Sequence, residues 1–418
     1  MKIHFTGILG QGMTALAEIL KARGTDVIGS DTMTESFTTN TVLKQAGIAV
    51  LPFTVANITD DIEKVIFSTA YRPDRHDELK EAKRRGIPLR AYGEALAELF
   101  NSFPHRVLIT GTHGKSTTSA MVGFILEQAG YDPTVIVGGE ALNWKRNSRA
   151  GKSDWIVAEG DEYQAKIRAL KPTVLVLTPI DYDHPDFFKT KKIYQNLFKK
   201  VAARVPNKYL VSSFFPLSAK QGNRISCRGM KLPYLFGTHN EENARLACRT
   251  AQTIGISERI VHRALRDFRG VARRLEYHSD PKANMVLLED YAHHPTEIRA
   301  ALDAVRARYP RHQIIAVFQP HTFSRTKAFL NDFVCSFQKA DVVVILKTYG
   351  SARENKRSAH GADAKTLSKK IALCHPRAFF ARTHQEAAKI ALRNFSSPGV
   401  ILIMGAGDVN RVLSLCAR

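Results

Sequence analysis

An eight-residue stretch at positions 111–118, GTHGKSTT, has the residue types of a phosphate-binding loop. It follows a short apolar run and precedes a predicted helix over residues 117–129, and this kind of loop requires that strand–loop–helix context. The loop departs from the usual pattern because Ile109 stands where a glycine is expected. Lys115 would bring its charge to the β- and γ-phosphates, and Ser116 would offer its hydroxyl to a metal ion. The residues of the loop that we predict to contact ATP are Gly111, Thr112, His113, Gly114, Lys115, Ser116 and Thr117.

Acidic and imidazole side chains follow the next two apolar runs of the same segment. Glu159 comes directly after residues 155–158, and His184 comes shortly after residues 174–178. Because the carboxyl ends of parallel strands meet at one edge of a sheet, we expect these side chains to lie near the loop. A lone histidine is usually only a packed or solvated imidazole, but this position predicts a divalent metal site formed by Ser116, Glu159 and His184, with Mg²⁺ or Mn²⁺ as the ion.

A second glycine-rich turn, Gly7-Ile-Leu-Gly10-Gln-Gly12, joins a predicted strand to a predicted helix at the start of the chain. Glycines there permit a tight turn and let backbone N–H groups reach a diphosphate at the helix N-terminus. Asp31 follows about twenty residues later, where a dinucleotide-binding fold has its ribose-binding acid. From these residues alone, a dinucleotide such as NAD is favoured, and a turn that binds nothing remains an alternative.

Apolar runs alternate with helical segments along the whole chain, which is typical of parallel sheets with helical crossovers. Predicted strands cover residues 2–7, 26–29, 64–68, 106–110, 155–158, 174–178, 285–288, 314–318, 342–346 and 400–403, and predicted helices cover residues 13–23, 77–85, 117–129 and 297–309. A single core rarely grows beyond about 250–300 residues, so a chain of 418 residues implies several domains. We predict an α/β protein with three domains, at residues 1–103, 104–271 and 272–418.

The formal net charge of +22 leaves two classes of partner open, nucleic acid and small anionic substrates. Basic residues occur all along the chain, and no aromatic-rich basic motif accompanies them, so no nucleic-acid partner is expected. The five cysteines are scattered singly, and the N-terminal apolar stretch is too short to cross a bilayer. We therefore expect a reduced, cytoplasmic protein without a signal peptide and without membrane insertion.

Seven motifs resemble those of the Mur ligase family, and the match runs over the whole chain in the order of the family. They are GTHGKSTT (111–118), AEGDE (158–162), IDYDHPD (180–186), GTHNEEN (237–243), VARRLE (271–276), DYAHHP (290–295) and FQPHTFSRT (318–326). The resemblance implies an ATP-dependent ligase that phosphorylates a carboxylate and then forms an amide. It also implies a Rossmann-like N-terminal domain whose glycine turn holds a UDP-sugar rather than NAD, a central P-loop ATPase-like domain, and a Rossmann-like C-terminal domain.

Within that family, the motifs are most similar to members that join L-alanine to the lactyl carboxylate of UDP-N-acetylmuramate in peptidoglycan precursor synthesis. Members that attach a tripeptide during murein recycling are the next most similar, and a nucleotide-binding sensor of cell-wall precursors is a further alternative. The resemblance implies catalytic roles for Lys115, Glu159, His184 and His293. It implies further ATP contacts from Asn240, Asn243, Arg274 and Asp290, and substrate contacts from Gly10, Gly12, Ser30, Asp31, Ser68, Tyr291, His321 and Arg325.

Three features depart from the family pattern. Gln164 replaces an aspartate, the stretch 206–237 is short, and Thr322 stands where the family has an arginine. The last change removes a cation from the expected amino-acid pocket, and Lys327 or Arg353 could replace it. The adjacent histidines His293 and His294 fit either a position near the acceptor or a packing and capping role.

Overall fold

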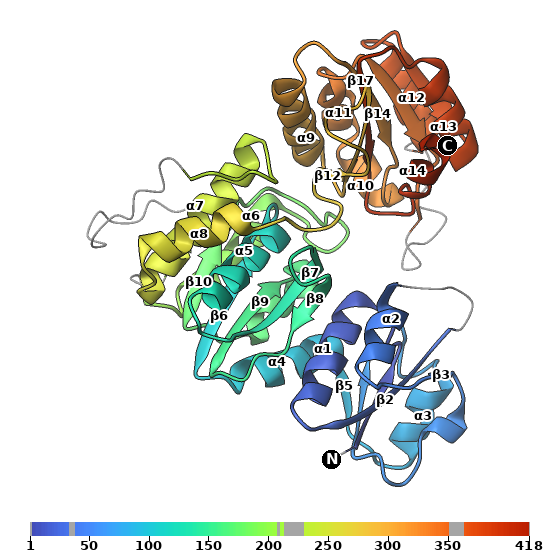
Figure 1. Cartoon of the computed structure of the whole chain (residues 1–418). Coiled ribbons are helices and arrows are strands. Elements are labelled where there is room, and N and C mark those ends of the chain that lie inside the picture. Colours follow the sequence, from blue (N-terminus) through green and yellow to red (C-terminus); the bar gives the residue numbers. More distant parts are fainter. Residues whose placement is uncertain (1, 33–37, 207–209, 213–229, 351–362, 418) are drawn as a thin grey trace. The chain divides into compact units, whose positions relative to one another are not determined.

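The computed structural model describes residues 2–32, 38–206, 210–212, 230–350 and 363–417. Three sheets of mainly parallel strands follow one another along the chain, each packed against helices (Figure 1). The chain forms two compact units: the first contains the first two sheets, and the second contains the third sheet together with Tyr182–Tyr194 and Leu232–Glu242. The predicted α/β fold class is confirmed, with three sheets in succession along the chain.

The first sheet has five parallel strands in the order β3-β2-β1-β4-β5. Its elements are β1 (Lys2–Thr6), α1 (Gln11–Ala22), β2 (Asp26–Asp31), α2 (Thr38–Gln45), β3 (Val50–Pro52), η1 (Val55–Asn57), β4 (Lys64–Phe67), α3 (Asp77–Arg84), β5 (Leu89–Ala91) and α4 (Tyr92–Asn101). The chain leaves β1 toward β2 on one side and continues to β4 on the other. The strand order therefore reverses beside β1, and open α/β sheets bind ligands at the carboxyl ends of strands beside such a reversal.

The second sheet has six strands in the order β11-β10-β6-β9-β7-β8, of which only β8 is antiparallel to its neighbour. Its elements are β6 (His105–Thr110), α5 (Lys115–Gln128), β7 (Thr134–Ala141), β8 (Arg146–Arg149), β9 (Trp155–Gly160), η2 (Tyr163–Ala169), β10 (Val174–Leu177), α6 (Lys191–Ala202), β11 (Leu210–Ser212), α7 (Thr238–Ile254) and α8 (Glu258–Asp267). The central strand β6 is fully buried over Val107–Ile109 and pairs with β9 and β10. The loop that follows β6 thus starts between the carboxyl ends of two neighbouring strands.

The third sheet has six strands in the order β12-β13-β17-β14-β15-β16, with β12 antiparallel to β13. Its elements are β12 (Glu276–Tyr277), β13 (Met285–Asp290), α9 (Pro295–Arg308), β14 (Gln313–Phe318), α10 (Phe323–Ala328), α11 (Leu330–Val334), η4 (Cys335–Phe337), β15 (Val342–Leu346), α12 (Ala364–Ala372), β16 (Ala378–Ala381), α13 (His384–Arg393), β17 (Gly399–Met404) and α14 (Arg411–Cys416). Buried side chains form a cluster on each face of this sheet, as expected for strands covered by helices on both sides.

Each predicted strand and helix overlaps an observed element, with ends shifted by a few residues. The shift matters at Glu159, which lies inside β9 and not after it, and at Asp290, the last residue of β13. The hairpin β7–β8 and the α7–α8 pair were not predicted. Among the described residues, no helix combines the length and the apolar composition needed to cross a membrane.

A buried hydrogen-bond network holds the strands of the first sheet to α3. The carboxylate of Glu78, which is 1% exposed, accepts hydrogen bonds from the hydroxyls of Thr6 (2.9 Å) and Ser30 (2.6 Å) and from the amide of Asn57 (2.8 Å). Burial alone would raise the pKa of Glu78. Hydrogen bonds from His4 and these neighbours outweigh burial and lower the pKa from 4.5 to about 2.

We expect Glu78→Gln to destabilise the protein by about 2 kcal/mol at pH 7, because charge-assisted hydrogen bonds contribute about 1.5–3 kcal/mol. A depressed carboxyl pKa contributes stability above the unfolded-state value of 4.5 and loses it as the pH falls toward 2. The difference in unfolding free energy between wild type and variant should therefore shrink over that range in urea denaturation. A difference that is constant between pH 7 and pH 2 would contradict the assignment.

Candidate functional site

The phosphate loop runs from Gly111 to Lys115, the first residue of α5. Gly111 has φ +146° and Gly114 has φ +77°, values that a residue with a Cβ rarely adopts. A Cβ at Gly111 would overlap Thr178 of the neighbouring strand end, and one at Gly114 would overlap the side chain of Asn243. Both glycines are therefore required by backbone conformation and by close packing.

The backbone N–H groups of the loop divide into two sets. Those of Thr112 and His113 donate to the carbonyl of Pro179, at 2.9 and 3.3 Å, and so fix the loop to the chain that follows β10. The first N–H groups of α5 have no acceptor within the helix, because helical hydrogen bonds begin four residues further on. The N–H groups of Lys115, Ser116 and Thr117 are therefore available to an anion, and the ATP contacts of Thr112 and His113 stay predictions.

The side chain of Lys115 folds back over this loop. Its Nζ donates to the carbonyls of Gly111 (2.8 Å) and Thr112 (2.9 Å), and it forms an ion pair of 3.0 Å with Glu162. Burial acts to lower the pKa of Lys115, but the charges of Glu162 and Glu159 raise it further than burial lowers it. Lys115 is thus a fixed positive charge, and Glu162 is a buried partner to which the sequence analysis had given no role.

Ser116 and Glu159 lie together, as predicted from the strand order. The hydroxyl of Ser116 donates to Glu159 Oε1 at 3.0 Å, and the backbone N–H of Gly138 donates to Oε2 at 2.5 Å. A Cβ at Gly138 would lie 2.7 Å from Oε2, so only glycine permits this approach. A carboxylate held beside a hydroxyl offers the oxygen ligands that Mg²⁺ prefers.

The two predicted adenine-contacting residues, Asn240 and Asn243, are both buried on α7. The amide of Asn240 donates to the carbonyl of Phe236 at 2.9 Å, in the second compact unit. Asn243, in the first unit, accepts a hydrogen bond of 3.3 Å from Thr118 of α5. Asn243 is therefore fixed to the helix that begins at the phosphate loop.

The glycine turn of the first sheet is held by the strand beside it. Gly7 has φ +82°, and its N–H donates to the carbonyl of Ser30 at 2.8 Å. Asp31 accepts a hydrogen bond of 2.7 Å from the backbone of Leu9, so this carboxylate fixes the turn. The turn, Asp31 and Ser68 all follow neighbouring strand ends, and the register aligns Thr6 with Ser30 and Phe67. These predicted substrate-contacting groups thus share one sheet edge.

Other predicted residues of this turn have structural contacts. Ser30 is fully buried and its hydroxyl donates to Glu78, so the structure gives that side chain a role in the Glu78 network. Gly10 is the N-cap of α1, and a Cβ at Gly12 would overlap the ring of Tyr92. Gly10 therefore begins the helix directly after the turn, and Gly12 lets α1 pack closely against Tyr92.

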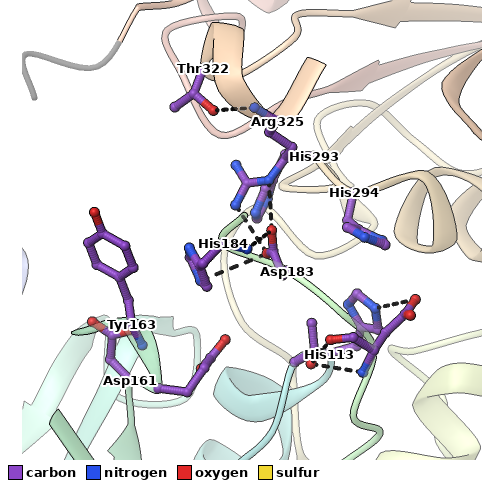
Figure 2. Close-up of polar contacts among 12 residues, drawn as sticks. His113, Asp161, Tyr163, Asp183, His184, His293, His294, Thr322 and Arg325 are labelled. Carbon is purple, nitrogen blue, oxygen red and sulfur yellow. Dashed lines mark hydrogen bonds and ion pairs between the residues drawn. The ribbon is translucent and has the colours of Figure 1, made fainter. Parts of the chain in front are cut away.

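In the second unit, Arg325 forms a buried ion pair with Asp183 (Figure 2). Nε donates to Oδ1 and Nη2 donates to Oδ2, each at 3.1 Å, and Nη1 lies 3.3 Å from Nδ1 of His321. Burial would raise the pKa of Asp183, but the charge of Arg325 dominates and holds that pKa well below its usual range. The predicted acceptor-binding arginine is thus paired with an acid that the sequence showed only as a neighbour of His184.

Two residues beside this ion pair have left-handed backbones. His184 has φ +56°, and its N–H donates to Asp183 Oδ1 at 2.7 Å. Thr322 has φ +67°, and its hydroxyl accepts a hydrogen bond from the N–H of Arg325 at 3.4 Å, which caps α10. Thr322 therefore has a capping role. Lys327 lies on α10, whereas Arg353 lies outside the described residues.

The adjacent histidines differ in their contacts. His294 caps α9: its Nδ1 accepts from the N–H of Thr296 and its own N–H donates to Glu297. His293 contacts the carbonyl of Tyr291 through Nδ1 at 3.0 Å, and burial lowers its pKa to about 3. His293 is therefore neutral at physiological pH, and the capping alternative applies to His294.

Asp290 and Tyr291, at the end of β13, are hydrogen-bonded to the segment that precedes β12. Both carboxylate oxygens of Asp290 accept backbone N–H groups, from Leu275 at 2.8 Å and Ala292 at 2.7 Å, and burial raises the Asp290 pKa to about 6. The guanidinium of Arg274 lies 5.1 Å from the centre of the Tyr291 ring. Asp290 thus fixes the backbone around Arg274, in addition to the ATP contact predicted for both.

A glycine-rich loop at the carboxyl end of a mainly parallel sheet, with one α/β sheet before it in the chain and one after it, defines the class: a three-sheet α/β protein with a loop of the phosphate-binding type. Models of three Mur ligase domains match in sequence: the family's catalytic domain over residues 2–104, its middle domain over residues 109–252, and its glutamate ligase domain over residues 273–407. The chain belongs to the Mur ligase family, and the family prediction made from the motifs is confirmed.

Relatives match this chain over nearly their whole length. It is 33% identical to UDP-N-acetylmuramate–L-alanine ligase of Desulfitobacterium hafniense (strain Y51), covering 99% of this chain and 98% of that protein. It is 32% identical to the protein of the same name from Aquifex aeolicus (strain VF5), covering 98% and 96%. The crystal structure of UDP-N-acetylmuramate–alanine ligase from Thermotoga maritima superposes with a TM-score of 0.81 at 26% identity, covering 100% and 98%. A murein peptide ligase from Psychrobacter arcticus 273-4 shares the fold, with a TM-score of 0.69 at 22% identity over 100% and 99% of the two chains.

Proposed function

We propose that this protein joins L-alanine to the lactyl carboxylate of UDP-N-acetylmuramate, using ATP, in peptidoglycan precursor synthesis. The observation that carries the proposal is the phosphate loop: its Lys115 folds back onto the loop, and Ser116 beside it is hydrogen-bonded to Glu159 of the neighbouring strand β9. The full-length similarity to ligases of that name supports the choice of substrates. We also propose the division into a UDP-sugar domain at 1–103, an ATP domain at 104–271 and an amino-acid domain at 272–418, acting in the cytoplasm.

The reaction has two chemical steps. The lactyl carboxylate attacks the γ-phosphorus of ATP, the bond to ADP breaks, and an acyl phosphate forms. The amine of the acceptor then attacks the acyl carbon, loses a proton and expels inorganic phosphate. Lys115 offsets the charge that develops on the transferred phosphoryl group, which is the main catalytic demand of the first step.

The residues near the loop fit a divalent metal. Ser116 and Glu159 supply oxygen ligands, and we assign His184 as a third ligand, although an imidazole suits Mn²⁺ better than Mg²⁺. When bound, the metal ion neutralises phosphate charge. The N–H of Gly138 donates a hydrogen bond to Glu159 and fixes the orientation of its carboxylate for this role.

The acceptor's identity is tested by an assay with the whole protein, ATP, Mg²⁺ and UDP-N-acetylmuramate. L-alanine, L-serine, glycine and the tripeptide are offered separately, and the product is identified by mass. We expect phosphate release and amide product with L-alanine at the highest kcat/KM. A higher value for the tripeptide would make the murein-recycling reaction the function. ATP binding without any amide product would favour the sensor alternative.

A further inference from the structure

Arg325, whose guanidinium we expect to hold the carboxylate of the acceptor amino acid, is already bound to a carboxylate of its own unit. Asp183 meets one edge of Arg325 with two parallel hydrogen bonds of 3.1 Å, the geometry in which arginine binds a ligand's carboxylate. Arg325 and Asp183 are both nearly fully buried, at 6% and 4% exposed. A free amino acid that uses this edge of Arg325 has to replace Asp183.

We infer that Asp183 occupies the position of the acceptor's carboxylate in the free protein, and that the acceptor binds by displacing Asp183 from Arg325. This inference rests on the proposed function. The exchange replaces one carboxylate by another, so Arg325 has a negative partner before and after it. The displaced Asp183 keeps the hydrogen bond from the N–H of His184 and has to find its further partners outside the ion pair. The internal ion pair therefore lowers the acceptor's affinity by the fraction of molecules in which it is closed.

The third nitrogen of Arg325 explains how the guanidinium stays in place during such an exchange. Nη1 donates toward Nδ1 of His321 at 3.3 Å, and the His321 ring stacks on Tyr349, with ring centres 5.8 Å apart and planes inclined by 15°. The backbone N–H of Arg325 also donates to the hydroxyl of Thr322, which fixes the main chain that carries this side chain. His321 can therefore hold the guanidinium while its Nε and Nη2 exchange Asp183 for another carboxylate.

The backbone beside Asp183 links this carboxylate to His184. His184 has φ +56°, a strained value for a residue with a Cβ, and its N–H is tied to Asp183 Oδ1. Through this hydrogen bond, a movement of Asp183 away from Arg325 would also move the backbone of His184. Acceptor binding and the orientation of His184, the proposed metal ligand, are therefore coupled through one residue.

The first test separates KM from kcat in Asp183→Asn, which keeps the shape of the side chain and removes its charge. At saturating ATP and UDP-N-acetylmuramate, we expect the KM for L-alanine to fall about tenfold, because the competing carboxylate is lost. We expect kcat to fall as well, since His184 loses its fixed neighbour. Asp341→Asn is the matched control: Asp341 pairs with Arg306 at 2.7 Å in the same unit, and its loss should leave the KM for L-alanine unchanged. An unchanged or higher KM in Asp183→Asn overturns the inference.

The second test observes the ion pair directly. In protein labelled with ¹⁵N-arginine, the Nε–Hε resonance of Arg325 is assigned by comparison with Arg325→Lys. We expect Asp183→Asn to shift this resonance in the free protein, and L-alanine to shift it in wild type with UDP-N-acetylmuramate and a non-hydrolysable ATP analogue present. A resonance that L-alanine does not move overturns the exchange.

Failure of the proposed function gives a different result. If wild type forms no amide product with L-alanine, the same resonance is titrated with acetate, the carboxylate alone. Movement with acetate supports the exchange of carboxylates on Arg325, and no movement contradicts it.

Discussion

Replacing Lys115 with methionine is expected to lower turnover by about 10³-fold or more, because a charge that stabilises the transferred phosphoryl group is removed. The same change should also lower the unfolding midpoint. Glu162, 1% exposed, loses its positive ion-pair partner, and a buried carboxylate that loses a positive neighbour costs stability. Initial rates and thermal unfolding of the purified variant measure the two effects separately.

The double variant Lys115→Met with Glu162→Gln distinguishes the catalytic effect from the structural one. Removing the buried negative charge of Glu162 should return the unfolding midpoint most of the way to the wild-type value, while turnover stays about 10³-fold below wild type. Recovery of turnover in the double variant would mean that Lys115 acts only by neutralising Glu162. Near-wild-type turnover in Lys115→Met alone would remove Lys115 from the catalytic residues.

Glu159→Gln is the second change with a large expected effect. Both carboxylate oxygens accept hydrogen bonds, from Ser116 and Gly138, and a glutamine must present its NH₂ group to one of these donors. We expect turnover to fall by about 10²-fold and the Mg²⁺ concentration for half-maximal rate to rise, because the proposed metal loses a charged ligand. Calorimetric titration of the variant with Mg²⁺ and a non-hydrolysable ATP analogue should show weaker binding than wild type.

Asp161→Asn is a matched control for this measurement. Asp161 belongs to the same acidic motif, but it pairs with Lys166 at 2.7 Å and is largely exposed. The Mg²⁺ concentration that Asp161→Asn needs for its half-maximal rate should stay at the wild-type value. The assignment of Glu159 as a ligand is refuted if both variants show the same metal requirement as wild type.

Mn²⁺ is expected to support the reaction well, since an imidazole such as that of His184 is an unusual ligand for Mg²⁺ and suits Mn²⁺ better. The comparison is made in Glu159→Gln as well as in wild type. If His184 is still a metal ligand in Glu159→Gln, this variant should keep a larger share of the wild-type activity with Mn²⁺ than with Mg²⁺. Equal losses with the two ions would argue against His184.

The sequence alone determined the features that depend on neighbouring residues. Strand–loop–helix order and glycine spacing predicted both the phosphate loop and the first glycine turn, because φ values of +146° and +77° at Gly111 and Gly114 require glycine whatever surrounds them. Apolar runs predicted the strands of the three sheets, because a strand buried on both faces must be apolar. The placement of Ser116 near Glu159 followed from the parallel order, because strand ends meet at one sheet edge.

Only the tertiary structure decided which polar groups pair with which. Three sets of pairs show this. Glu162 and Lys115 are 47 positions apart, Asp183 and Arg325 are 142 apart, and Glu78 is 72 and 48 positions from Thr6 and Ser30. No local sequence pattern encodes pairs at such separations. The same holds for Ser30 and His294, whose residue types fit binding or catalysis, but whose burial and capping contacts appear only once the sheets and α9 are packed. Low exposure favours each of these pairings, since a buried charge or hydroxyl without a partner costs a sizeable part of the small net stability of a fold.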